Sequence, residues 1–386
     1  MKYDVVIAGA GPAGSTLARR LAGAGLEVLV LEKEFMPREK PCGGGITYKA
    51  ARLLDFPWQD VIEDTVHTAV FSYQGKSEVT VRLKTPLAYM VTRSSFDRML
   101  ADRARQAGAC LVEGAPVKDI AVENGLVTVA AAGETYQGRL FVGADGVNGR
   151  SAMLLGLHHP GETGPTLEAE VACPPEVLEQ KRGTIRLDCG AVPWGYGWVF
   201  PKRDRLSTGV GAFTRKVKEL KKLLGGFLAR EGLGSARILS LRGYPIPSGG
   251  RKKRIHSRSA LLIGDAAGLV DPFSGEGIYY AIKSAHLAAE AILDSRAQPE
   301  GAPGLYQSLV DRHVTAELME ARRLARVFYT FPRVAFGLVE KNPDIAGQLC
   351  QIVCGEGNYS GLKEAAAEVI RAILSRKRTA GSLPHH

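Results

Sequence analysis

The hydrophobic pattern near the N-terminus predicts a strand, a helix and a second strand in succession. Residues 4–8 form a short apolar run, Leu17 and Leu21 continue an apolar spacing of helical period, and residues 27–31 are again apolar and strand-like. Segments that follow one another so closely predict a βαβ unit, the repeating element of a parallel sheet covered by helices.

Two later segments also place a strand directly before a glycine-rich loop. Residues 140–151 begin as a short apolar strand and continue into Gly143, Asp145 and Gly146. Residues 260–292 give a stronger pattern, in which an apolar strand ends at Asp265, a loop follows, and a long helix closes the segment.

Between these segments, apolar and polar residues alternate at the period of a β-strand. The alternation occupies residues 66–89, 166–171 and 184–213, which we expect to form an antiparallel sheet. From about residue 300 onward the pattern is helical, and the composition of residues 376–386 predicts disorder.

A basic amphipathic helix is predicted in the segment RKVKELKKLLGGFL, which begins at Arg215. We expect Val217, Leu220, Leu223 and Leu224 to lie along its apolar face. No internal repeat is visible in the chain, and its length of 386 residues allows two or three domains with a buried core.

The net charge of +10 is compatible with nucleic acid, anionic lipid or phosphorylated substrates as partners. No nucleic-acid-binding motif accompanies the charge, so we expect no nucleic acid partner. The segment 316–343 interleaves arginines with aromatic residues, which is typical either of a surface that touches an anionic membrane or of a helical cap over a substrate tunnel.

The six cysteines form no CxxC motif and have no metal-ligand spacing with histidines, so we expect no metal site. Cys350 and Cys354 have the spacing of one helix face, which we favour over a redox pair. Met1 leads directly into a strand, so no signal peptide is expected and the cytoplasm is the expected compartment. Residues 324–339 are too short and too charged for a membrane-spanning helix.

The loop of the N-terminal βαβ unit carries the spacing GxGxxG at Gly9, Gly11 and Gly14. Glycines at this spacing allow a tight turn and let a pyrophosphate approach the amides at the start of a helix. Glu32 ends the second strand, where a carboxylate accepts hydrogen bonds from a ribose diol. The motif therefore predicts bound FAD or NAD rather than NADP.

Taken together, the three glycine-rich segments resemble the FAD-binding domain of the para-hydroxybenzoate hydroxylase-like flavoproteins. The segment VTRSSFDRML resembles the same superfamily, and the resemblance implies that Arg93 approaches the flavin from the start of a helix; a surface helix cap is the alternative. It further implies cofactor contacts for the following residues: Gly9, Gly11, Ala13, Gly14, Glu32, Arg93, Val117, Asp265, Gly275, Gly277 and Ile278.

An unusual stretch, EKPCGGGIT, places Cys42 between a proline and three glycines. A second motif, PWGYGWVFP, aligns Tyr196, Trp198 and Phe200 on one side of a strand. The two motifs, in this order and with the FAD segments around them, resemble the geranylgeranyl reductases over roughly residues 1–340. In that family the cysteine loop crosses the isoalloxazine ring, which implies contacts to the flavin from Cys42, Gly43 and Gly45.

The resemblance implies an α/β fold: a Rossmann-like FAD-binding domain, an antiparallel-sheet substrate domain and a helical C-terminal region. The FAD-binding domain is discontinuous, and the expected limits are 1–58, 90–160 and 250–300 for the FAD-binding domain, 59–89 and 161–249 for the substrate domain, and 301–386 for the helical region.

The activity implied is FAD-dependent reduction of C=C bonds in an isoprenoid chain. Cys42 and Tyr196 are the candidates for polarising the site or relaying a proton, and Tyr196, Trp198 and Phe200 are the candidates for contacting the isoprenoid. Without a second GxGxxG motif, the electron donor, NADPH or NADH or a ferredoxin, is expected to dock transiently. The protein is expected in the cytoplasm, with peripheral contact to an anionic membrane, and the sequence predicts no oligomeric state.

Other interpretations stay open at this level. Cys42 can instead be a small buried hydrophobe, and the aromatic strand can be ordinary core packing. An aromatic-ring monooxygenase shares every FAD motif. An electron-transfer flavoprotein that reduces quinone is the third reading, although such proteins usually add an iron–sulfur domain, and no cysteine cluster is present for one.

Overall fold

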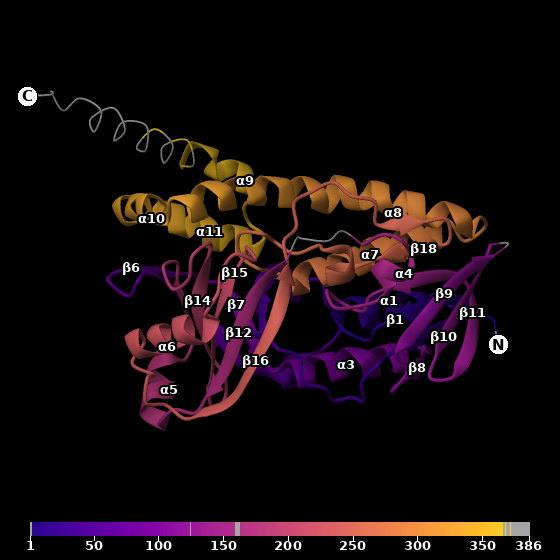
Figure 1. Ribbon diagram of the computed structural model, residues 1–386, viewed down its shortest axis with the longest axis horizontal. Coiled ribbons are helices and arrows are strands. Elements are labelled where there is room, and N and C mark those ends of the chain that lie inside the picture. Colours follow the sequence, from indigo (N-terminus) through magenta and orange to yellow (C-terminus); the bar gives the residue numbers. More distant parts are fainter. Residues whose placement is uncertain (1, 124, 159–162, 366, 368–370, 372–386) are drawn as a thin grey trace, which may run out of the picture.

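The computed structural model describes residues 2–123, 125–158, 163–365, 367 and 371. Two large sheets lie next to each other, and the C-terminal helices α8–α11 cross over the top of both in Figure 1. The predicted fold class is confirmed: a Rossmann-like sheet, a second sheet and a helical C-terminal region are all present. The segment 376–386, predicted to be disordered, lies outside the described residues.

The first sheet contains the predicted βαβ unit and has a parallel centre in the order β18-β11-β1-β2-β8. Its eight strands are β1 (Lys2–Ala8), β2 (Val28–Leu31), β8 (Cys110–Val112), β9 (Val117–Glu123), β10 (Leu126–Ala131), β11 (Glu134–Gly143), β17 (His256–Ser257) and β18 (Ala260–Leu262). In this order the ends of β1, β2 and β18, with the glycine-rich loops that follow them, lie at one edge of the sheet.

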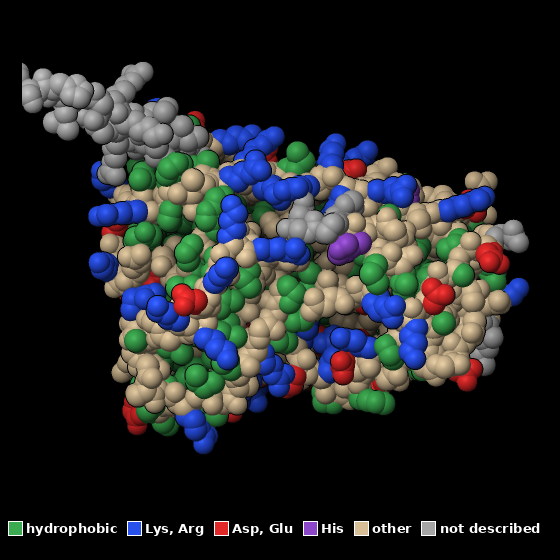
Figure 2. Space-filling model, viewed as in Figure 1, with side chains coloured by type: hydrophobic (Ala, Val, Ile, Leu, Met, Phe, Trp, Pro, Cys, Tyr) green, Lys and Arg blue, Asp and Glu red, His purple; other side chains and the backbone are tan. Residues whose placement is uncertain are grey.

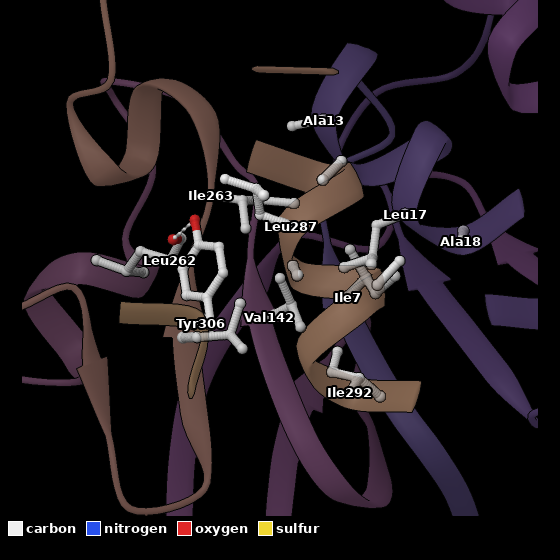
Figure 3. Packing of buried hydrophobic residues seen from close by; sticks show 14 of the residues in the cluster. Ile7, Ala13, Leu17, Ala18, Val142, Leu262, Ile263, Leu287, Ile292 and Tyr306 are labelled. Atoms are coloured by element: carbon white, nitrogen blue, oxygen red, sulfur yellow. Dashed lines mark hydrogen bonds between the residues drawn. The ribbon is translucent and has the colours of Figure 1, made fainter. Parts of the chain in front are cut away.

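Helices α1 (Pro12–Gly23) and α7 (Ile278–Asp294) pack on each other and on this sheet. Figure 3 shows Leu17 of α1 and Leu287 of α7 meeting beside Ile7 of β1, and all three side chains are buried. The Tyr306 hydroxyl donates a 2.9 Å hydrogen bond to the carbonyl oxygen of Leu262, which satisfies the one polar atom of that fully buried ring. This core holds the two glycine-rich helix starts in fixed positions.

The second sheet has seven strands in the order β16-β12-β15-β14-β13-β5-β6. They are β5 (Thr68–Tyr73), β6 (Ser77–Arg82), β12 (Thr163–Val171), β13 (Thr184–Asp188), β14 (Gly195–Pro201), β15 (Leu206–Ala212) and β16 (Ile238–Pro247). The expectation of a purely antiparallel sheet is wrong at one pair, because β13 runs parallel to β5. These two strands come from distant parts of the chain, so no hairpin fixes their relative direction.

A small third sheet, in the order β3-β7-β4, connects the two large ones. Its strands are β3 (Gly45–Thr47), β4 (Ile62–Val66) and β7 (Ala88–Val91). Strand β3 continues the CGGG loop, so the loop joins the sheet at its last glycine, Gly45.

The remaining helices are α2 (Tyr48–Ala51), α3 (Arg93–Gln106), α4 (Ser151–Leu154), α5 (Pro175–Lys181), α6 (Leu220–Arg230), α8 (Ala302–Val310), α9 (Ala316–Thr330), α10 (Pro332–Lys341) and α11 (Asp344–Cys354). A π-helical turn, Asp311–Thr315, joins α8 to α9. Both cysteines of α11, Cys350 and Cys354, are buried in one hydrophobic cluster, as the one-face interpretation predicted. Within the described residues, no helix is long and apolar enough to cross a membrane.

The basic amphipathic helix is shorter than predicted. Glu219 has a left-handed backbone with φ of 59°, so α6 begins only at Leu220 and Val217 lies before it. The buried residues of α6 are Leu224, Phe227 and Leu228, and they cover one face of the second sheet.

Candidate functional site

The loop between β1 and α1 is packed too tightly for any side chain at two of its glycines. A methyl group at Gly9, which has φ of +100°, would lie 2.6 Å from the carbonyl oxygen of Ala144, and one at Gly14 would lie 1.9 Å from the carbonyl oxygen of Gly9. No side chain caps the N-terminus of α1, where Gly11 is the N-cap and Pro12 opens the helix. The first amides of α1 are therefore available to a phosphate.

The carboxylate of Glu32 lies beside this loop at the end of β2. Its Oε2 accepts a 2.7 Å hydrogen bond from the amide of Ala10, and its Oε1 accepts one of 3.1 Å from the amide of Glu34. The Nε of Arg38 lies 3.6 Å from the same carboxylate. Each carboxylate oxygen keeps a free lone pair, which a ribose hydroxyl could use; the ribose contact of Glu32 stays a prediction.

Arg93 is the first residue of α3, as the sequence predicted, and its side chain is locked in place. Its Nε and Nη2 donate 2.8 Å hydrogen bonds to the two carboxylate oxygens of Asp97. Burial lowers the pKa of Arg93, but Asp97 more than compensates and the net pKa is raised. A second guanidinium, that of Arg38, lies 3.1 Å from Asp97. Arg93 is thus a fixed, permanently charged cation in the cavity wall.

The segment after β18 places a carboxyl and two glycines at the start of α7. Asp265 follows Gly264, and burial raises its pKa while Lys40 and Arg93 lower it. Gly275 has φ of +75°, and Gly277 is the N-cap of α7 with no side-chain cap. This gives a second helix start whose amides face the cavity without a side-chain partner.

A buried ion pair supports the Gly275–Gly277 loop from below. The Nζ of Lys49 lies 2.8 Å from a carboxylate oxygen of Glu276 and 3.9 Å from one of Glu317. Burial opposes the charge on Lys49, but the carboxylates raise its pKa overall. Asp271 accepts hydrogen bonds from two amides of the same loop and from the hydroxyl of Tyr359, at 2.6–2.9 Å.

The CGGG loop lies directly on the aromatic strand β14. A methyl group at Gly43 would lie 2.7 Å from the ring of Phe200 and 3.2 Å from Nε1 of Trp198, so this glycine is required by the close approach. The amide of Gly44 donates a 3.4 Å hydrogen bond to Sγ of Cys42. Lys202, which is fully buried, donates to the carbonyl oxygens of Gly43 at 2.7 Å and Val91 at 2.6 Å.

Tyr196, Trp198 and Phe200 form one continuous aromatic row, with ring centroids 6.3 Å and 6.5 Å apart. The hydroxyl of Tyr196 donates to the carbonyl oxygen of Ser274, and burial raises the pKa of this phenol. The indole Nε1 of Trp198 is buried and has no hydrogen-bond partner among the described residues. The row therefore joins the second sheet to the loop before α7.

One cavity of about 680 Å³ collects nearly all the site residues that the sequence predicted. Its lining includes Gly9, Gly11, Ala13, Glu32, Cys42, Gly43, Gly45, Arg93, Val117, Tyr196, Trp198, Phe200, Asp265, Gly275, Gly277 and Ile278. Gly14 is the exception, because it packs against Gly9 behind the loop. The roles assigned to these residues remain predictions, but the residues themselves line the same cavity.

Three charged residues of the site were not predicted. Lys40 places its Nζ 3.1 Å from the centre of the Tyr244 ring, and burial lowers its pKa to about 8. Glu168 of β12 lines the cavity, and Lys202 lies beneath the CGGG loop. The sequence contained only a weak indication of Glu168. The alternation of apolar and polar residues at 166–171 predicted its strand, but nothing in the sequence places that strand beside Cys42.

These features fit a flavin dinucleotide. The cradle at Gly9 and Gly14 suits a pyrophosphate, and two uncapped helix starts face the same cavity. A buried oxygen of Asp145, Oδ1, has no hydrogen-bond partner in the described part of the chain. In the described part of the chain, no group of three or more His, Cys, Asp or Glu side chains could hold a metal ion.

Comparison with known proteins agrees with this geometry. The model of the FAD binding domain family matches residues 2–180. A geranylgeranyl diphosphate reductase from Rhodobacter capsulatus is 32% identical over 307 residues, which cover 76% of this chain and 75% of the relative. A menaquinone reductase from Mycobacterium tuberculosis is 33% identical over 353 residues, which cover 86% of this chain and 85% of the relative.

A solved structure shares the fold. The geranylgeranyl bacteriochlorophyll reductase-like protein of Thermoplasma acidophilum superposes with a TM-score of 0.79 and 22% identity over 96% of each chain. The resemblance drawn from the CGGG loop and the aromatic strand is confirmed. The chain belongs to the geranylgeranyl reductase family of FAD-dependent oxidoreductases.

Proposed function

We propose that this protein uses FAD to reduce C=C bonds in the isoprenoid chain of a lipid, a diphosphate or a quinone. The observation that carries the proposal is the continuity of its cavity. The same cavity is lined by the glycine loops, by Cys42 and by apolar residues of the second sheet and the C-terminal helices, and the part lined by these apolar residues is the apolar chamber. A long hydrocarbon chain held in that chamber would lie next to the flavin site.

The chamber has walls from two parts of the fold. The second sheet contributes Ala69, Phe71, Ile185 and Leu187, and the C-terminal helices contribute Phe328, Tyr329, Phe336, Val339, Leu349, Cys350 and Val353. Its polar groups are neutral or engaged: burial raises the pKa of both Cys189 and Cys350 to about 12, and the hydroxyl of Tyr329 donates to the carbonyl oxygen of Phe273 at 2.6 Å. An uncharged lining of this kind favours an isoprenoid over a phenolic acid.

Bound FAD, once reduced, supplies the hydride in this chemistry. The chain's own residues hold the alkene still and keep water out, since an isolated trisubstituted alkene is a poor hydride acceptor and proximity must supply much of the rate. Cys42 stands where the chamber meets the cofactor groove, and we assign it to polarising the site or relaying a proton. Tyr196 is a weaker candidate for the relay, because its proton is already donated to Ser274.

NADPH, NADH or a ferredoxin is the proposed electron donor. The chain has one GxGxxG motif, and in this proposal FAD occupies the phosphate site that the motif forms. A nicotinamide donor would therefore dock only for the time of electron transfer.

We further propose that the helical edge of the protein rests on an anionic membrane, where a lipid substrate is found. Phe331 is 41% exposed at the turn between α9 and α10, and Arg326 and Arg333 are exposed on either side of it. Figure 2 shows Lys and Arg side chains gathered along the edge where α8–α10 lie. Cosedimentation with anionic but not zwitterionic vesicles, weakened in Arg326→Glu/Arg333→Glu, is the expected result.

The decisive experiment is anaerobic. The purified holoprotein is reduced with dithionite, mixed with geranylgeranyl diphosphate or a prenylated quinone, and followed by flavin absorbance and product mass. Reoxidation accompanied by the gain of two hydrogen atoms per double bond supports the proposal. Flavin that stays reduced with every prenyl compound, but converts a phenol to a hydroxylated product when oxygen is admitted, would make the protein a hydroxylase.

A further inference from the structure

Glu168 lies in the middle of β12, on the face of the second sheet that lines the cavity. Its cross-strand neighbour on β15 is Gly209, and the ring of Trp198 occupies the space over that glycine. A methyl group at Gly209 would lie only 2.3 Å from the Trp198 ring. Because Gly209 has no side chain, the indole extends over it toward Glu168, whose side chain is only 8% exposed.

The backbone amide of Cys42, at the start of the CGGG loop, lies near enough to the carboxylate of Glu168 to lower its pKa. Trp198, which is 8% exposed, directs an unpartnered Nε1 to the same place, since a methyl group at Gly43 would lie 3.2 Å from that atom. A buried acid and an unsatisfied donor thus flank the point where the apolar chamber meets the cofactor groove. Such groups are seldom left in a wall that only packs.

Several charged and polar groups near Glu168 shift the pKa of its carboxyl group. Burial is the main cause that raises its pKa, to about 7, and Glu170 on the same strand raises it further. Lys202, the amide of Cys42 and Arg93 of α3 lower its pKa.

Two arginines near this strand are already paired elsewhere. Arg205 holds Glu170 at 2.6 Å, and Arg242, the partner of Glu168 on β16, lies 3.5 Å from Glu39. Neither arginine therefore forms an ion pair with Glu168. The result is a carboxyl group that can exist in both protonation states near neutral pH.

We propose that Glu168 is the acid that provides the proton for alkene reduction, a role that rests on the proposed function. One alkene carbon accepts a hydride, with its two electrons, from the reduced flavin. The other carbon takes the proton as the O–H bond of Glu168 breaks. The π bond is lost, two C–H bonds form, the flavin is left oxidised and Glu168 is left as a carboxylate. Solvent water reprotonates Glu168, and the external donor re-reduces the flavin before the next turnover.

The test compares Glu168→Gln with Glu170→Gln, a matched control on the same face of the strand that does not line the cavity. Single-turnover reoxidation of the dithionite-reduced holoprotein by geranylgeranyl diphosphate is measured between pH 6 and 9. We expect the wild-type and Glu170→Gln rates both to fall as pH rises, because the acid must be protonated. The fall should come above about pH 7 in the wild type and at lower pH in Glu170→Gln, since Glu170 raises the pKa of Glu168. Glu168→Gln should be slower by on the order of 100-fold and lose this pH dependence.

Glu168→Asp keeps the acid and should recover part of the rate together with the pH dependence, which a purely structural role would not do. A second measurement needs no turnover. In the resting holoprotein, the infrared carbonyl band of a protonated carboxylic acid should titrate with an inflection near pH 7, and this titrating band should be absent in Glu168→Gln.

An active wild type with an unchanged rate and pH profile in Glu168→Gln overturns the role of Glu168 and leaves the proposed function intact. A wild type that reduces no prenyl compound overturns the proposed function and this role together. If Glu168→Gln binds no FAD, Glu168→Asp decides: a rate that is independent of pH in that variant overturns the proposal.

Discussion

Replacing Gly14 by alanine puts a methyl group where the fold has no room for one. The new carbon would lie 1.9 Å from the carbonyl oxygen of Gly9, 3.1 Å from its carbonyl carbon and 3.3 Å from the Cβ of Ala144. Ordinary contact begins at about 3.4 Å, so α1 and the loop at Gly9 must separate by about 1.5 Å. Because the obstacle is backbone rather than a flexible side chain, rotamer changes cannot relieve it.

The expected cost follows from this geometry. Overpacking of a well-filled core costs about 1–3 kcal/mol, and a backbone clash belongs to the upper part of that range. Gly23 in the same helix is a matched control, because nothing lies within 4 Å of its hypothetical Cβ. Gly23→Ala should be neutral or more stable by up to about 1 kcal/mol, since alanine favours the helix.

Urea unfolding followed by circular dichroism gives the free energy of unfolding, and the flavin absorbance of the purified protein gives the FAD content. We expect Gly14→Ala to lose both stability and FAD, because the widened loop no longer presents its amides to the pyrophosphate. Wild-type stability and FAD content in Gly14→Ala would refute the assignment of this loop as the phosphate cradle.

Three further predictions concern separate parts of the site and its support. Cys42→Ala should keep its FAD and lose about tenfold in turnover, equal to about 1.4 kcal/mol of transition-state stabilisation, measured by single-turnover reoxidation. Lys49→Met should cost about 3–5 kcal/mol in urea unfolding because Glu276 is left buried and unpaired, whereas Lys363→Met, at a side chain that is 63% exposed, should change stability by less than about 0.5 kcal/mol. His286→Gln should reduce the stability lost between pH 7 and pH 5 by about 1 kcal/mol, after allowance for solvent screening, measured by urea unfolding at both pH values.

The sign for His286 follows from its pKa, which burial and nearby cations lower to about 4 from 6.5. The unfolded chain binds the proton as pH falls below 6.5 while the folded protein does not, so acid destabilises the fold until about pH 4. Equal pH slopes in wild type and His286→Gln would show that this histidine is not protected. For Cys42→Ala, unchanged turnover at unchanged FAD content would remove the thiol from the mechanism, and equal stabilities of the two lysine variants would contradict the buried ion pair.

Local motifs were readable from the sequence because neighbouring residues make them. Gly9, Gly11, Gly14 and Glu32 belong to one βαβ unit, so short-range spacing alone predicts where a pyrophosphate and a ribose would lie. The period-two pattern that contains Tyr196 predicted a strand in the same way.

Other elements were not predicted correctly from the sequence, and the structure shows why. Strand β16 has no alternation, because it is an edge strand on which Ile238, Leu239 and Leu241 are all exposed. The start of α6 was placed too early, because nothing local announces the left-handed turn at Glu219.

The sequence by itself determined the cofactor cradle, the order of the elements and the pairing of the cysteine loop with the aromatic strand as family motifs. Only the tertiary structure decided that Glu168 meets the amide of Cys42, that Lys202 holds the loop from beneath, and that the C-terminal helices close the apolar chamber. The physical reason is range: a backbone turn is specified by residues in contact along the chain, whereas the pKa of an acid and the shape of a chamber depend on groups that meet only after three separate segments have packed together.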